Sequence, residues 1–165
     1  MIISLLKKYS TLIASLIFAA LIVCVRFKIT GIVYFTFLVW NLFLAVLPYF
    51  FSQTLLALED KKKHWALKYT VFGLWLLFLP NSPYIITDFI HLNNQGNSLI
   101  WLDMLIIFVY ALNGLLFGLL SMLDIYEFLN QKFEKRTTNS IMIYICMLCG
   151  YGVYLGRFLR FNSWD

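Results

Sequence analysis

The chain has 165 residues, of which 62% are hydrophobic and only 13% are charged, and its mean hydropathy is +0.82. A water-soluble domain of this length could not bury so much apolar surface in a single core, so the composition excludes an ordinary soluble protein. The formal net charge of +5 arises in the segments between apolar runs. It therefore gives no support to nucleic-acid binding.

Five apolar segments follow one another along the chain, each close to the roughly 20 residues that a helix needs to cross a bilayer. Strict alternation of apolar and polar residues, which would indicate a membrane β-barrel, is absent. We therefore predict an all-α fold, a polytopic transmembrane helical bundle that forms a single domain over residues 1–165. The expected spans are 9–27, 30–56, 65–80 followed by a short helix at 83–92, 99–123 and 138–159.

The first span follows Lys7 and Lys8, as the apolar stretch of a secretory signal would. No small-x-small cleavage motif comes after it, so we interpret it as a retained span. The distribution of positive charge then predicts a cytoplasmic N-terminus, a C-terminus outside, and a location in the cell membrane. On this topology nine cations lie inside and four outside: Lys7, Lys8, Lys61, Lys62, Lys63, Lys68, Lys132, Lys135 and Arg136, against Arg26, Lys28, Arg157 and Arg160.

The third span is broken at Pro80–Pro83, within "FLPNSPYIITDFIHL". Pro80 comes twelve residues after Lys68, which is only about 18 Å of helix, so the break should lie below the outer lipid surface. Irregular backbone at that depth survives only when it is packed in protein or lines a wet cavity. We expect Ser82 to cap a new short helix whose N-terminus points into the outer third of the membrane. A proline kink packed against its neighbours is the alternative.

The short helix carries a polar stripe, because Tyr84, Thr87, Asp88 and His91 recur at helical spacing. Polar groups at this depth favour either pairing between helices or a ligand site. An anionic ligand would be held by arginines and by the N–H groups near the break. The candidate ligand-binding residues are Asn81, Ser82, Tyr84, Thr87, Asp88, His91, Asp103, Arg157 and Arg160.

Arginines at the outer end of the fifth span go against the positive-inside tendency and need partners. Arg157 and Arg160 are neighbours on one helix face, and Asp103 opens the fourth span. The simplest prediction is that these arginines pair with Asp88 and Asp103, joining the last three spans.

A metal site is a weaker interpretation, in which Asp88, His91 and Asp103 would be the ligands. The only other histidine, His64, falls on the opposite side of the predicted topology. The pair Cys146 and Cys149 lies within an apolar run, where filler residues are the simpler reading. The sequence indicates no cofactor, and its catalytic residues, if any, stay unknown.

Two asparagines lie deep within spans, Asn41 in the second and Asn113 in the fourth. They are typical of hydrogen bonds between helices, with a polar substrate path as the alternative. Two G-x-x-x-G motifs, Gly114–Gly118 and Gly152–Gly156, predict close helix approach. They serve either packing within the chain or self-association. Membrane lipid is the expected surrounding partner.

Four ordered motifs, "WNLFLAVLPY", "LPNSPYIITDFIHL", "WLDMLIIFVYALNGLLFGLLS" and "GVYLGRFLRFNSWD", resemble the bacterial DUF1361 family of multi-pass membrane proteins. The resemblance covers most of residues 40–165 apart from the charged loops. It implies a membrane location and no assigned activity. Family members usually continue with further apolar spans, so the resemblance implies a chain shortened after Asp165.

Two classes of function remain open at this point. One is a transporter-like or accessory membrane component that binds a small anionic or polar solute on the outer side. Its five spans show no internal repeat, which argues against a self-contained carrier. The other is an outer-leaflet enzyme acting on a phosphate-bearing lipid or its head group, with Asp88 or His91 as acid or base. No recognised catalytic motif supports it, so we favour the first.

Overall fold

The computed structural model of this chain describes residues 2–31, 35–58, 65–94 and 99–159. Its helices, in chain order, are α1 (Ile2–Thr30), α2 (Thr36–Ala57), α3 (Trp65–Phe78), α4 (Asn81–Tyr84), the 3₁₀-helix η1 (Ile85–Asn94), α5 (Ile100–Asn130) and α6 (Lys135–Arg157). Counting Trp65–Ile90 as one bent span, five helices are long and apolar enough to cross a membrane. The predicted helical membrane class and the five spans are confirmed.

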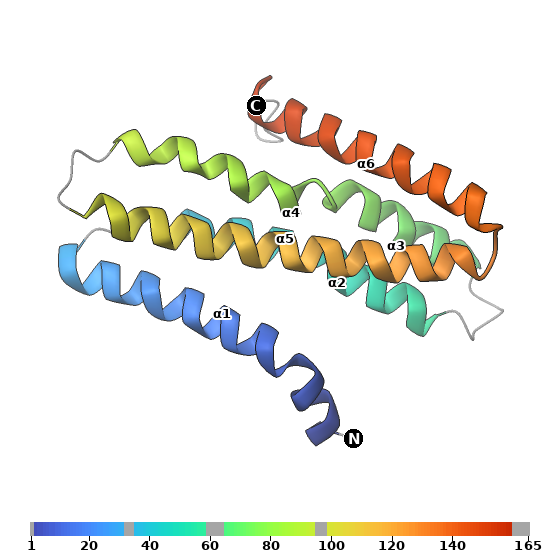
Figure 1. Cartoon of the computed structure of the whole chain (residues 1–165), viewed down its shortest axis with the longest axis horizontal. Helices are drawn as coiled ribbons and strands as arrows, with labels where there is room; N and C mark the ends of the chain where they lie inside the picture. The colour runs from blue at the N-terminus through green and yellow to red at the C-terminus, as the bar shows by residue number, and fades with distance from the viewer. Residues whose placement is uncertain (1, 32–34, 59–64, 95–98, 160–165) are drawn as a thin grey trace.

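Successive spans run in alternating directions, and α5 lies at the centre of the bundle (Figure 1). It contacts α1, α2, α4, η1 and α6. In the most apolar 18-residue stretch of α5, 56% is buried, whereas the corresponding shares are 17% for α1 and 6% for α6. The bundle therefore consists of α2, α5 and the interrupted third span, with α1 and α6 added as flanking helices (Figure 1).

The ends of the first two spans differ slightly from the prediction, for a local reason. Gly31 has φ of +68°, and its N–H donates to the carbonyl of Phe27 at 2.7 Å. This left-handed glycine is a common way to end a helix. The second helix consequently starts only at Thr36, six residues after the expected start at 30.

Apolar side chains form two buried clusters at different levels of the bundle. One contains Leu38 and Leu42 of α2 with Ile106 and Ile107 of α5. The other lies further along both helices and contains Leu55 of α2, Trp75 of α3, and Ile125 and Phe128 of α5. The interruption of the third span packs on α2 and α5 at positions between these clusters.

The interruption at Pro80 is a change of helical geometry rather than an extended break. Pro80 itself has helical angles, φ −59° and ψ −23°. The Ser82 N–H bonds to Leu79 at 3.1 Å, one residue closer than in an α-helix. The Phe78 carbonyl instead receives the Asn81 side-chain amide at 2.9 Å. The backbone is thus satisfied by local rearrangement, as apolar surroundings require.

The short helix begins earlier than expected and is mostly of the 3₁₀ type. The expectation of Ser82 as an N-cap was wrong, because the segment is already helical from Pro80 onward. Ser82 donates to the Ala45 carbonyl of α2 at 2.9 Å, so its hydroxyl joins two spans instead of capping one. A 3₁₀ run as long as Ile85–Asn94 is unusual, since such helices rarely exceed 3–4 residues and often mark hinges.

Candidate functional site

The C-terminal end of α6 meets the interrupted third span at Arg157. Its guanidinium donates to the backbone carbonyl of Thr87 and lies 3.6 Å from the Asp88 carboxylate. It also approaches the Tyr84 hydroxyl at 3.5 Å and lies 5.4 Å from the centroid of that ring. Three predicted site residues of the polar stripe therefore converge on one arginine.

Asp88 is the buried centre of this group, with 2% of its side chain exposed. One carboxylate oxygen faces Arg157, and the other accepts a hydrogen bond of 2.8 Å from the Asn41 amide of α2. The group therefore joins three parts of the chain: α2, the interrupted span and α6. We call Asn41, Tyr84, Thr87, Asp88 and Arg157 the Asp88 cluster.

A second buried ion pair joins α1 to α5. Arg26 contacts Asp103 through two nitrogens, Nε at 2.5 Å and Nη2 at 3.1 Å, and each side chain is only 4% exposed. Arg26 also lies 5.8 Å from the centroid of the Phe35 ring. Asp103 was expected to pair with an arginine of the last span, but Arg26 contacts both of its oxygens. Arg157 instead faces Asp88, and Arg160 lies outside the described residues.

The glycines of α5 make room for the interruption. A Cβ on Gly118 would lie 2.6 Å from the Ser82 Cβ, and one on Gly114 would lie 3.1 Å from the Ser82 carbonyl oxygen. Both distances are below ordinary contact, so α5 admits the Ser82 turn only because these positions lack side chains.

The glycines of α6 receive the same segment from the other side. A Cβ on Gly152 would lie 2.6 Å from Cγ of Pro80, and one on Gly156 would lie 3.3 Å from the Tyr84 ring. Both G-x-x-x-G motifs thus serve packing within the chain, on opposite sides of one short segment. Self-association through them stays a prediction.

The two intramembrane asparagines each hydrogen-bond to another helix. Asn113 accepts from the Ser15 hydroxyl of α1 at 2.7 Å and donates to the Val109 carbonyl at 2.8 Å. Asn41 is bonded within the Asp88 cluster. These contacts agree with the interhelical interpretation of both residues.

Several predicted site residues do not take part in the Asp88 cluster or cannot be placed. Asn81 and Ser82 are engaged by the Phe78 and Ala45 carbonyls. Arg160 and the side chain of His91 lie outside the described residues. The described residues contain no group of three or more His, Cys, Asp or Glu side chains arranged to hold a metal ion.

A partly buried polar contact at Asp124 also joins α2 to α5, and the sequence did not predict it. The fourth span was expected to end at residue 123, whereas α5 continues to Asn130. The Asp124 carboxylate accepts bonds from Ser52 at 2.6 Å and Gln53 at 2.7 Å. The available signal was its spacing: Asp103, Tyr110, Phe117 and Asp124 follow at intervals of seven. Residues so spaced share one helix face.

Comparison with protein-family models finds one match over residues 40–165, to the model described as "Protein of unknown function (DUF1361)". The matched range begins within α2 and contains the whole Asp88 cluster, whereas Arg26 and the rest of α1 precede it. Comparison with curated proteins and with solved structures finds no match.

Proposed function

This chain belongs to the DUF1361 family, and from that premise we propose that it is a multi-pass membrane protein whose Asp88 cluster binds a small anionic or polar solute. In this role the protein is a transporter-like or accessory component. Arg157 is the residue that contacts the solute. Asp88 and Asn41 hold the arginine in place and complete the polar surface around it.

The contrast between the two buried ion pairs carries this proposal. Arg26 and Asp103 make a close two-point contact, and both side chains are 4% exposed, as expected of a permanent clamp. Arg157 and Asp88 are 3.6 Å apart, and the arginine side chain is 16% exposed while the aspartate is 2% exposed. The second pair is longer and open on the cationic side, which suits an arginine that exchanges partners.

The position of the cluster supports the same role. Arg157 is the last residue of α6, a helix in which only 6% of the most apolar stretch is buried. Its side chain contacts a 3₁₀ segment of unusual length. Ligand sites in membrane transporters commonly use such broken helices. A guanidinium has five N–H donors in a planar fork, so it can bind a carboxylate or phosphate group in two-point fashion.

Partner exchange at Arg157 would still leave the Asp88 carboxylate with a hydrogen-bond donor, although without its ionic partner. Asp88 keeps the 2.8 Å bond from Asn41 when the guanidinium turns toward a solute. This matters because an unpaired charge in apolar surroundings is costly. Asn41 therefore supports the exchange by holding Asp88 in both states.

We further propose that the cluster faces the outer side, with the N-terminus in the cytoplasm. Of the four cations assigned outside, Arg26 and Arg157 each have a buried carboxylate partner. The charge of each arginine is balanced by its carboxylate partner. These two arginines are therefore weaker evidence against a cytoplasmic N-terminus than two unpaired cations would be. The enzymatic alternative would use Asp88 or His91 as an acid or base. Both oxygens of Asp88 are already engaged, and the His91 side chain lies outside the described residues.

A thermal-shift experiment tests the binding role. The purified protein is heated in detergent with inorganic phosphate, acetate or glycine as probes, and ligand binding should raise Tm. At least one probe should stabilise the parent protein and the Lys28→Ala control, which removes an exposed cation near the end of α1. The same probe should not stabilise Arg157→Ala or Arg157→Gln.

Two results would contradict the proposal. One is the same rise in Tm for the parent protein and both Arg157 variants, which would place binding elsewhere. The other is the absence of any shift with all three probes at millimolar concentration. Either result would leave the Asp88 cluster as a clamp between helices.

A further inference from the structure

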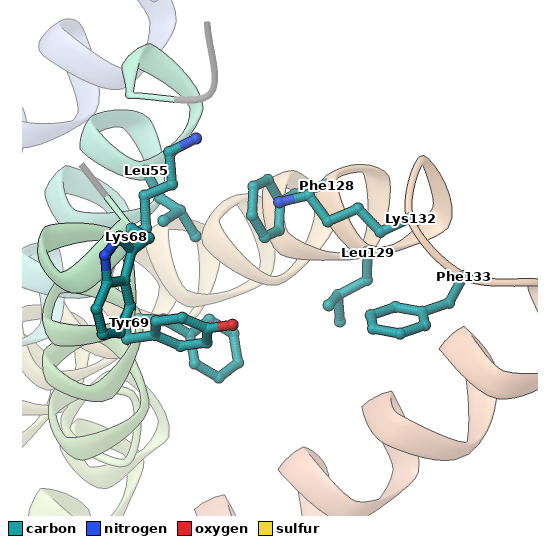
Figure 2. A pocket seen from close by; sticks show the side chains of 9 residues that line it. Leu55, Lys68, Tyr69, Phe128, Leu129, Lys132 and Phe133 are labelled. Carbon is teal, nitrogen blue, oxygen red and sulfur yellow. The ribbon is translucent and has the colours of Figure 1, made fainter. Parts of the chain in front are cut away.

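A cavity of about 340 Å³ lies at the opposite end of the bundle from the Asp88 cluster. Figure 2 shows lining side chains from α3 and from Leu55 of α2 on one side, and from the end of α5 and Phe133 just after it on the other. Leu55, Phe72, Phe128 and Phe133 contribute apolar walls, and Lys68 and Lys132 add two cations. The volume is at the lower end of the range of roughly 300–1,000 Å³ for ligand sites.

Among the described residues that line the cavity, the walls are apolar and the two charged side chains are both cationic. Nine residues line the cavity, and none of these nine is acidic. The Lys132 ammonium lies 3.6 Å from the centroid of the Phe128 ring, so the aromatic wall holds this charge at the cavity (Figure 2). Such a lining suits a ligand with a negative group next to an extended apolar part.

Two aromatic residues at the cavity are of the kind that is common at the level of the lipid head groups. Trp65 and Tyr69 line it and pack edge to face at 6.1 Å between ring centroids, while 70% and 72% of their surfaces stay exposed. Exposed tryptophan and tyrosine at helix ends are typical of the interface between hydrocarbon and head groups. A ligand at this level reaches the cavity from the bilayer.

We propose that this cavity binds one anionic glycerophospholipid. The lipid phosphate contacts Lys68 and Lys132, and part of an acyl chain lies between Phe72 and Phe133. Basic pockets between transmembrane helices are known to bind anionic lipid head groups. The site is separate from the Asp88 cluster, so either proposal can fail without the other.

Lipid binding is measured by native mass spectrometry of the detergent-purified protein with phosphatidylglycerol, phosphatidylcholine or glycerol phosphate. One phosphatidylglycerol should stay bound. Phosphatidylcholine should bind at least about tenfold more weakly because it has no net charge, and glycerol phosphate should not stay bound because it has no acyl chain. Equal retention of either competitor would overturn the proposal.

Variants distinguish lipid binding at this cavity from non-specific attraction of anionic lipid to the positive charges of the protein. Lys68→Ala/Lys132→Ala should lower phosphatidylglycerol binding by at least about tenfold, since each lysine contributes to anion attraction. Lys68→Arg/Lys132→Arg should retain it. The matched control Lys135→Ala/Arg136→Ala removes the same charge from the same end of the bundle and should bind like the parent protein. An equal loss in this control would overturn the proposal.

Discussion

The ring of Pro80 lies directly against Gly152, and a Cβ added to that glycine would come within 2.6 Å of the proline Cγ. The break in the third span and the small-residue face of α6 therefore fit each other. Arg157 lies five residues further along α6, so this contact also sets where the guanidinium meets Asp88.

The first prediction concerns this contact. Gly152→Ala should lower the free energy of unfolding by about 1–3 kcal/mol, because the new methyl group overpacks against a rigid ring. It should also weaken any stabilisation by solutes that bind at Arg157. Thermal unfolding in detergent measures the first effect, and the same scan with the phosphate probe measures the second.

Gly150→Ala is the matched control on the same helix. A Cβ at Gly150 has no atom within 4 Å, and alanine favours the helix over glycine by about 0.5–1 kcal/mol. This variant should be as stable as the parent protein or slightly more stable. If both alanine variants unfold alike, the packing of α6 on Pro80 does not contribute to stability.

The second prediction concerns Arg26 and Asp103. Arg26→Leu or Asp103→Leu should each destabilise the protein by about 3–5 kcal/mol, because each leaves a buried charge without its partner. Replacing both residues by leucine should restore most of the loss, since no charge then stays buried. A double-mutant cycle of unfolding free energies measures this coupling. Additive losses would show that the two side chains act independently.

The five spans and the break in the third were predictable from the sequence, and the pairing of Arg26 was not. The spans follow from the lengths of the apolar runs, and the break follows from the position of the prolines. Both can be read directly along the sequence. The sequence also suggested that Arg157 pairs with Asp88, and the two side chains lie 3.6 Å apart. Which arginine faces Asp103 depends on how each helix is rotated about its axis, and local sequence does not contain that angle.

The function of Ser82 was mispredicted for a related reason. The Ser-Pro pair is typical of a helix start, but Pro80 already has helical angles, which leaves no non-helical cap position at Ser82. The hydroxyl then bonds to Ala45 of α2, a residue 37 positions away. Tertiary packing between the glycines of α5 and α6 overrides the local pattern.

The third prediction concerns the amide of Asn81. Asn81→Ala should destabilise the protein by about 1–3 kcal/mol, because the Phe78 carbonyl loses the donor that replaces its helical partner. The parent and variant are compared by thermal unfolding. Asn130→Ala, at an exposed position on the last residue of α5, is the control and should change stability by no more than about 0.5 kcal/mol. Equal stability of the two variants would mean that water satisfies the Phe78 carbonyl.

The fourth prediction concerns orientation and is tested by cysteine labelling in intact cells. In a background where Cys24, Cys146 and Cys149 are replaced by alanine, Asn97→Cys should react with a membrane-impermeant maleimide added outside. Lys135→Cys should react only after the membrane is permeabilised, because it begins α6 at the other end of the bundle (Figure 1). These results follow if the lysine-rich end faces the cytoplasm.

The reverse labelling pattern would move both proposed sites to the other leaflet. The Asp88 cluster would then meet cytoplasmic solutes, and the cavity between Lys68 and Lys132 would face outer-leaflet lipids. Neither the Arg157–Asp88 contact nor the lining of the cavity would change, because both depend on packing within the chain. The labelling result therefore decides which solutes and lipids can reach the two sites, while the Arg157 and lysine variants decide whether they bind.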